Sequence, residues 1–222
     1  MSRSKQHKYD LAEELDNVIQ SPMDFHSACK GKWKSDFFKN DHPIVLEIGC
    51  GKGEYTLGLG KLFPEKNFIG VDIKGDRLAS GGLNAKKQLL DNVCFLRIHV
   101  QFITDFFNEN EIDEIWITFP DPRPKDRDEK KRLTNPFFLE KYHLILKPEG
   151  LLHLKTDSDS LFDYSIETIE KPQWEKLVLT KDLYQSTWNN DHFGIKTRFE
   201  EIFYNKGFSI KYLRAVNKKE AR

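Results

Sequence analysis

The chain has few cysteines and no long hydrophobic run, and each absence excludes a class of protein. The three cysteines are widely spaced, odd in number and outside any CxxC pair, which argues against a disulfide framework and against a zinc site. We therefore expect Cys29, Cys50 and Cys94 to be ordinary buried or half-buried thiols, and no metal to be bound. No apolar stretch approaches membrane-spanning length, and residues 1–10 contain no apolar segment of the signal-peptide kind. These features predict a cytoplasmic protein without a membrane partner.

Net charge is absent as well, because 35 lysines and arginines balance 35 aspartates and glutamates. Any binding of nucleic acid must therefore depend on how the charges are distributed and not on their sum. Basic clusters do occur along the chain, although a single cluster is ordinarily no more than a solvated face. They lie within residues 3–8, 30–39, 123–132 and 211–222.

Apolar runs that alternate with helix-like segments predict the fold class. The 222 residues suffice for one ordinary α/β domain with a full core, which we place at 41–222 after an N-terminal extension, 1–40, with one amphipathic piece at 11–19. The alternation predicts a Rossmann-like α/β fold, a mostly parallel sheet with right-handed crossovers and helices on both faces. The predicted strands are 44–48, 67–72, 93–98, 114–119 and 151–156, and the predicted helices are 55–63, 77–90 and 136–146, the last with Asn135 as N-cap and Pro136 at its first position.

A glycine-rich loop with the sequence EIGCGKG, residues 47–53, leaves the first predicted strand and enters a helix. A dinucleotide-binding loop would need glycine at position 54, where this chain has glutamate. The spacing of Gly49 and Gly51, with Glu47 just before them, is instead typical of S-adenosylmethionine-dependent methyltransferases. A carboxylate also suits a cationic ligand such as a sulfonium that carries an amino group.

Two further carboxylates follow predicted strands. Asp72 ends the second strand, where an acid can accept hydrogen bonds from both ribose hydroxyls. Asp121 follows the fourth strand between Pro120 and Pro122, which restrict its backbone. Taken alone, this segment could equally be a proline-rich turn, but the basic residues that follow suit a polyanionic substrate. Since ligands of open α/β sheets bind at the carboxyl ends of the strands, we expect these acids to share one site.

The last quarter of the chain contains a second group of candidate residues. Asp157 follows the predicted strand 151–156, and Thr197 with Glu200 opens a helix that runs to Asn205 and stops at Lys206-Gly207. A strand-like segment, 208–216, comes next. A threonine with glutamate three residues later is also a capping box, so a purely architectural role for this pair stays open.

Together these motifs resemble the bacterial tRNA (guanine-N7)-methyltransferases, which methylate a guanosine in the tRNA variable loop. The resemblance covers about 43–214 and lies in EIGCGKGE, GVDIK, FPDPRPKDRDEKKRLT, HLKTD and IKTRFEEIFYNKG. It implies that 41–222 is a methyltransferase domain that uses S-adenosylmethionine and a tRNA substrate, with Asp121 as the central catalytic residue between cofactor and guanine. The cofactor would be held by Glu47, Gly49, Gly51, Asp72 and Asp121, and the tRNA or its target base by Lys125, Asp157, Thr197 and Glu200.

Four residues depart from the pattern of that family. Arg123 stands where the family usually has tryptophan, and Asp128 where it has histidine. His99 and Val100 occupy the place of an acid and an alanine near the cofactor's adenine, so we assign no cofactor role to His99.

The chemistry of N7 predicts what the carboxylates do. This nitrogen has an in-plane lone pair and no proton, so methyl transfer needs no general base and positioning dominates. Asp121, Asp157 and Glu200 are suitable acceptors for the N1–H and N2–H2 edge of guanine, once the base is splayed out of the tRNA. Two alternatives stay open: a small-molecule methyltransferase that shares Glu47 and Asp72, and a non-catalytic RNA-binding relative.

Overall fold

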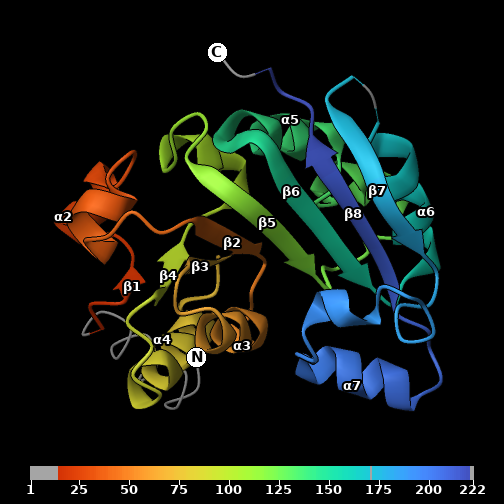
Figure 1. The fold of residues 1–222 in the computed structure, drawn as a ribbon, viewed down its shortest axis with the longest axis horizontal. Helices are drawn as coiled ribbons and strands as arrows, with labels where there is room; N and C mark the ends of the chain where they lie inside the picture. Colours follow the sequence, from red (N-terminus) through yellow and green to blue (C-terminus); the bar gives the residue numbers. More distant parts are fainter. Residues whose placement is uncertain (1–14, 171, 221–222) are drawn as a thin grey trace.

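A computed structural model describes residues 15–170 and 172–220, and its centre is one eight-stranded sheet (Figure 1). The strand order is β1-β4-β3-β2-β5-β6-β8-β7. Neighbouring strands from β1 to β6 in this order run parallel, whereas β8 is antiparallel to both β6 and β7. The strands are β1 (Val18–Ile19), β2 (Ile44–Ile48), β3 (Asn67–Asp72), β4 (Val93–Arg97), β5 (Ile112–Thr118), β6 (Leu146–Thr156), β7 (Trp174–Thr180) and β8 (Lys211–Asn217).

Helices cover both faces of this sheet, as the alternation of the sequence predicts. Successive residues of β2 belong to opposite apolar clusters, Leu46 with α5 and Val45 with α3 and α4, so the central strand is buried on both sides. The helices are α2 (Asp24–Ala28), α3 (Glu54–Leu62), α4 (Gly75–Lys87), α5 (Pro136–Ile145), α6 (Asp159–Thr168) and α7 (Arg198–Asn205). Short irregular turns of helix occur at Trp33–Phe38, Val100–Asp105, Asp126–Lys131 and Asn189–His192.

Local sequence signals account for several element boundaries. β2 and β3 have the predicted bounds, and α5 begins with the predicted N-cap, because the Asn135 side chain accepts a hydrogen bond from the Phe137 amide and Pro136 takes the first helical position. The strand predicted near the end of the chain is β8, which is antiparallel to its neighbours. Sequence reasoning did not identify α6 or β7.

The segment before residue 41 packs on the sheet over its described part. Val18 and Ile19 extend the sheet as a parallel edge strand beside β4, and Trp33 is fully buried against Phe107, with ring centroids 5.3 to 5.4 Å from Phe25 and Phe107. Residues 11–14 of the predicted amphipathic piece lie outside the described residues, and the end of that piece is β1.

All three cysteines are buried and free, as expected. Within the described residues, no helix combines the length and the apolar character needed to cross a membrane. The same part of the chain contains no cluster of three or more histidine, cysteine or acidic residues arranged to hold a metal ion.

Candidate active site

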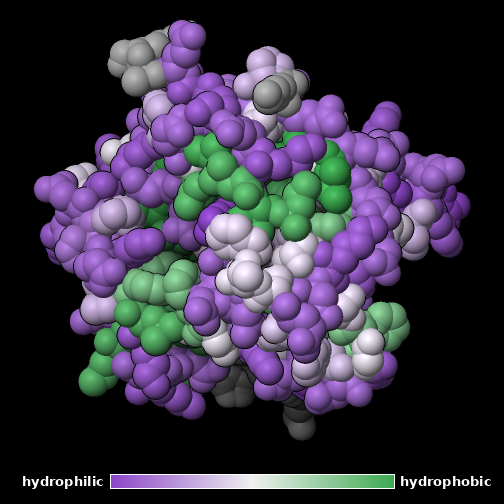
Figure 2. All heavy atoms as spheres, turned by 45° about the vertical axis from the view of Figure 1, so that its right-hand side comes forward, coloured by the Kyte–Doolittle hydropathy of each residue, from purple (hydrophilic) through white to green (hydrophobic). Residues whose placement is uncertain are grey.

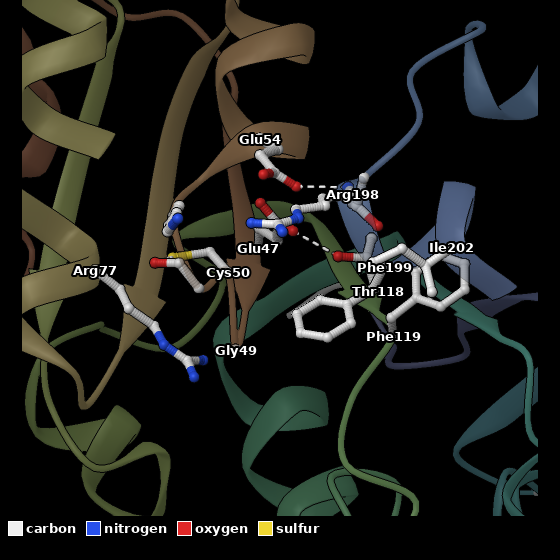
Figure 3. Close-up of a pocket in the computed structure, with 13 residues that line it drawn as sticks. Glu47, Gly49, Cys50, Glu54, Arg77, Thr118, Phe119, Arg198, Phe199 and Ile202 are labelled. Carbon is white, nitrogen blue, oxygen red and sulfur yellow. Dashed lines mark hydrogen bonds between the residues drawn. The ribbon is translucent and has the colours of Figure 1, made fainter. Parts of the chain in front are cut away.

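Two adjoining cavities lie at the carboxyl ends of β2, β3 and β5, the edge where the sequence predicts a site. The first has a volume of about 360 Å³ and contains Glu47 and Thr197 in its wall (Figure 3). The second, of about 410 Å³, contains Asp72 and Asp121. Because both are lined by Gly49, Arg77 and Phe119, they form one groove across the glycine loop.

The glycine loop has the backbone that its sequence requires. Gly49, Gly51 and Gly53 have φ angles of 75°, 59° and 72°, in the left-handed region that residues with a side chain rarely adopt. A Cβ on Gly51 would meet no atom within 4 Å, so this glycine leaves the groove open where a ligand would approach. The Gly51 amide also donates to Asp72 Oδ2 at 2.9 Å, which joins the loop to the end of β3.

Glu47 lies buried at the base of the first cavity and is surrounded by donors. Its Oε2 accepts hydrogen bonds from the Thr56 amide at 2.9 Å and from the Thr56 hydroxyl, and its Oε1 accepts from the Thr118 hydroxyl at 2.5 Å. Burial raises the pKa of Glu47 to about 7, although these hydrogen bonds oppose the shift. A carboxyl group that titrates near neutrality is thereby held beside a cavity, where a cationic ligand would favour its ionised form.

The wall of the second cavity near Asp72 combines this carboxylate with apolar neighbours. Asp72 Oδ1 accepts from the Lys74 amide at 2.9 Å, and Ile73, His99 and Val100 lie beside it in the cavity wall. The residues present therefore fit S-adenosylmethionine. Glu47 and the open glycine loop line the first cavity, and Asp72 with its apolar neighbours lines the second. His99 and Val100 lie in this wall. Their position shortly after the end of β4 is the feature of the sequence that could have identified them.

Asp121 lies at the rim of the second cavity, with its side chain 61% exposed. Its Oδ1 accepts from the Arg123 amide at 3.2 Å, and its Oδ2 is 3.2 Å from Arg123 Nε. Phe119 and Arg123 have φ angles of 48° and 47°, so two non-glycine residues in the left-handed region flank the prolines. The Arg123 carbonyl in turn accepts from Arg132 Nε at 3.1 Å. The conformation of Asp121 is thus set by Arg123 as well as by the prolines.

Lys125 and Asp157 do not line either cavity. Lys125 is exposed just before the helical turn Asp126–Lys131, and Asp157 is half-buried directly after β6. The buried Lys211 ammonium donates to the Asp157 carbonyl at 2.9 Å, which fixes the backbone there.

Thr197 and Glu200 have different surroundings although they form one motif. The capping box is present, since the Thr197 hydroxyl accepts from the Glu200 amide at 3.1 Å and Glu200 Oε2 accepts from the Thr197 amide at 3.2 Å. Thr197 lines the first cavity, whereas the Glu200 side chain is fully buried on the inner side of α7. Its Oε1 lies 2.8 Å from Lys155 Nζ and accepts from the Tyr184 hydroxyl at 2.7 Å. Burial lowers the pKa of Lys155, and Glu200 opposes that shift.

Sequence reasoning assigned no role to several residues of this site. Thr56 and Thr118 hold Glu47, Lys155 pairs with Glu200, and Phe119 lines both cavities. Phe119 and Lys155 belong to the motifs FPDPRPKDRDEKKRLT and HLKTD, and Thr118 directly precedes the first of them. Their place at the end of a strand is the local signal that could have identified them.

Solved structures of similar fold are methyltransferases. The 16S rRNA methyltransferase KamB superposes with a TM-score of 0.66 at 12% identity, with 90% of this chain and 96% of that chain covered. The 16S rRNA (adenine(1408)-N(1))-methyltransferase from Catenulisporales acidiphilia gives a TM-score of 0.59 at 13% identity, over 86% and 94%. At these identities the likeness establishes the fold alone.

Sequence comparisons are more specific. A family model described as "Putative methyltransferase" matches residues 41–213. The tRNA (guanine-N(7)-)-methyltransferase of Bacteroides thetaiotaomicron is 48% identical over 90% of this chain and 76% of its own length. The corresponding enzyme of Christiangramia forsetii is 44% identical, over 96% and 97%. With its glycine loop and two acid-lined cavities, the chain belongs to the tRNA (guanine-N(7)-)-methyltransferase family of S-adenosylmethionine-dependent enzymes.

Proposed function

We propose that this chain transfers a methyl group from S-adenosylmethionine to N7 of a guanosine in the variable loop of tRNA, and that it does so in the cytoplasm, where tRNA is matured. The observation that carries the proposal is the continuity of the groove. Glu47 lines one of its cavities, Asp72 and Asp121 line the other, and Phe119 belongs to both. A carboxylate that can recognise guanine is therefore next to the place where the methyl donor would lie.

The residues that would hold the cofactor divide between the two cavities. Glu47 would favour the positively charged methionine end, and the open backbone at Gly49 and Gly51 would lie against it. Asp72 would accept hydrogen bonds from the ribose hydroxyls, with the adenine against the apolar wall near His99. When bound, the cofactor supplies an electrophilic methyl group on a sulfonium.

Asp121 would orient the base and would not act as a general base, because N7 of guanine has no proton to remove. Its carboxylate is exposed and is contacted by two N–H groups of Arg123. The N1–H and N2–H2 edge of guanine also presents N–H donors, so it could take the place of Arg123. Such positioning next to the methyl donor contributes to the rate mainly through orientation.

The remaining candidate residues would contact the tRNA from around the groove. Thr197 lines the first cavity, Lys125 is exposed beside the Asp121 loop, and Asp157 lies at the end of β6. We assign Glu200 an indirect part, because its carboxylate is fully buried and holds α7 through Lys155 and Tyr184.

Incubation with labelled S-adenosylmethionine and an unmodified tRNA transcript, followed by mapping of the modified base, tests the proposal. Asp121→Ala should retain cofactor affinity within about threefold and lose transfer by at least about a hundredfold, since orientation contributes several kcal/mol to such reactions. Asp126→Ala is a matched control, because it removes another exposed carboxylate five residues away and should retain activity.

Unchanged transfer by the Asp121 variant would contradict the assigned role of this residue. Methylation of a small molecule without RNA would instead indicate the first alternative function. Binding of tRNA without any transfer would indicate a non-catalytic relative.

A further inference from the structure

Helix α7 buries an acidic residue and exposes apolar ones, which is unusual for a surface helix. Glu200 is fully buried, whereas Phe199 is 57% and Ile202 38% exposed. Phe199, Ile202 and Phe203 are spaced at i, i+3 and i+4, so they share one face of the helix, which we call the outer face of α7. Exposed apolar side chains that share a face usually mark a contact surface.

The inner side holds the helix in place through charged and polar contacts. The Lys155 ammonium and the Tyr184 hydroxyl both contact the Glu200 carboxylate, and Tyr204, one turn further on, packs against Tyr184 with ring centroids 4.7 Å apart. The amide of Arg198 donates to Glu54 Oε2 at 2.7 Å, which ties the start of α7 to α3. Phe199 is thus exposed on a helix that is firmly attached, and not on a loose segment.

The outer face of α7 is continuous with the methyl-donor groove. Phe199 and Ile202 both line the first cavity, and Figure 3 shows the Phe199 and Ile202 side chains near Phe119 on the side of the cavity opposite Arg77. The face drawn in Figure 2 is mostly hydrophilic, with hydrophobic residues gathered in a few areas. Exposed cations lie beside this face, since Arg198 directly precedes Phe199 and the Lys206 ammonium lies over the Phe203 ring, 5.6 Å from its centroid. A third exposed cation, Lys196, lies over the Tyr184 ring on the inner side.

We infer that the outer face of α7 is a stacking surface for the guanine that is to be methylated, with Phe199 as the residue that contacts the base plane. This inference rests on the proposed function and assigns the part of the substrate that α7 contacts. A splayed nucleobase has two flat apolar faces, and its phosphates are anionic, so a face with exposed aromatic and aliphatic side chains and a cationic border complements both. The buried Lys155–Glu200 pair keeps this surface over the first cavity.

A cycle that combines a protein variant with a change in the RNA tests the inference. The probes are an unmodified tRNA transcript and the same transcript with an abasic site at the target position, each bound in the presence of S-adenosylhomocysteine. Phe199→Ala should weaken binding of the intact transcript by about tenfold to a hundredfold, the range expected for loss of one base–aromatic stack. It should weaken binding of the abasic transcript by no more than about twofold, since the partner of the stack is then missing.

Two further variants distinguish stacking from a general loss of apolar area or of structure. Phe199→Trp should restore binding of the intact transcript, and Phe199→Leu should not, because leucine retains the bulk but not the aromatic face. Leu89→Ala is the matched control, since it removes an apolar side chain that is 84% exposed just after the end of α4 and should leave binding unchanged.

Equal losses for the intact and abasic transcripts, or full activity of Phe199→Leu, would overturn the inference. If the wild-type protein methylates tRNA while Phe199→Ala binds both transcripts normally, only the inference fails. If the wild-type protein does not methylate tRNA at all, the proposed function fails.

Discussion

Glu47 is a buried carboxyl group whose charge depends on pH near neutrality. Burial raises its pKa to about 7 in the free protein, so it is mostly protonated at pH 6 and mostly ionised at pH 8. A cationic ligand favours the ionised form, so below pH 7 binding must be accompanied by loss of a proton. We expect the affinity for S-adenosylhomocysteine, whose amino group carries the positive charge, to fall about fivefold as the pH is lowered from 7 to 6, measured by calorimetry without RNA.

Substitution at the same position provides the check. Glu47→Gln cannot ionise, so its affinity should be lower at pH 7.5 and nearly independent of pH between 6 and 7.5. Glu54→Gln is the control, because Glu54 also lines the first cavity and a glutamine can still accept from the Arg198 amide. A pH dependence that persists in Glu47→Gln would show that another group titrates on binding.

At the scale of elements, the buried Lys155–Glu200 pair joins β6 to α7. Removal of one partner leaves the other charge uncompensated in an apolar environment, which typically costs about 3–5 kcal/mol. We therefore expect Lys155→Met to lower the free energy of unfolding in urea by about that amount, and Lys155→Met combined with Glu200→Gln to regain much of it. Lys181→Met removes the exposed partner of Asp163, 3.0 Å away, and should cost less than about 1 kcal/mol. Equal effects of Lys155→Met and Lys181→Met would contradict this account.

The same elements illustrate what can be predicted from the sequence and what cannot. Continuous apolar runs next to turn residues predict β2 and β3 correctly, because buried parallel strands impose that pattern. β7 was missed because it is an edge strand with an irregularity between Lys176 and Val178 and with exposed leucines, so it lacks regular alternation.

The candidate site likewise contains residues that the sequence predicts and contacts that it does not. Glu47, Asp72 and Asp121 follow strands, and the rule that strand ends meet at one edge brings them to one groove. The contact of Lys155 with Glu200 joins residues 45 positions apart, and no local pattern encodes it. Likewise, the ion pair of Asp121 with Arg123 depends on the left-handed backbone of Arg123, which its residue type does not predict.

At the scale of the whole molecule, the balance of charge conceals an uneven distribution. The sum is zero, yet Lys52, Arg77, Arg123, Lys131 and Arg198 line the two cavities. Two of these cations have acidic partners, because Arg123 pairs with Asp121 and Lys131 with Asp128. Glu47 and Asp72 instead accept hydrogen bonds from threonines and backbone amides. We therefore expect Lys52, Arg77 and Arg198 to be available for the phosphates of an RNA substrate.

This distribution predicts a steep salt dependence for RNA and a shallow one for the cofactor. If about three phosphates are neutralised, the affinity for tRNA should fall roughly thirtyfold between 50 and 200 mM salt, because bound counterions are released on association. The affinity for S-adenosylhomocysteine, a small ligand without phosphates, should change by no more than about twofold. Lys125→Gln should reduce the slope of log affinity against log salt by about one, whereas Lys87→Gln, an exposed cation in the last turn of α4, should leave it unchanged. A reaction that is insensitive to salt and proceeds without RNA would indicate a small-molecule substrate.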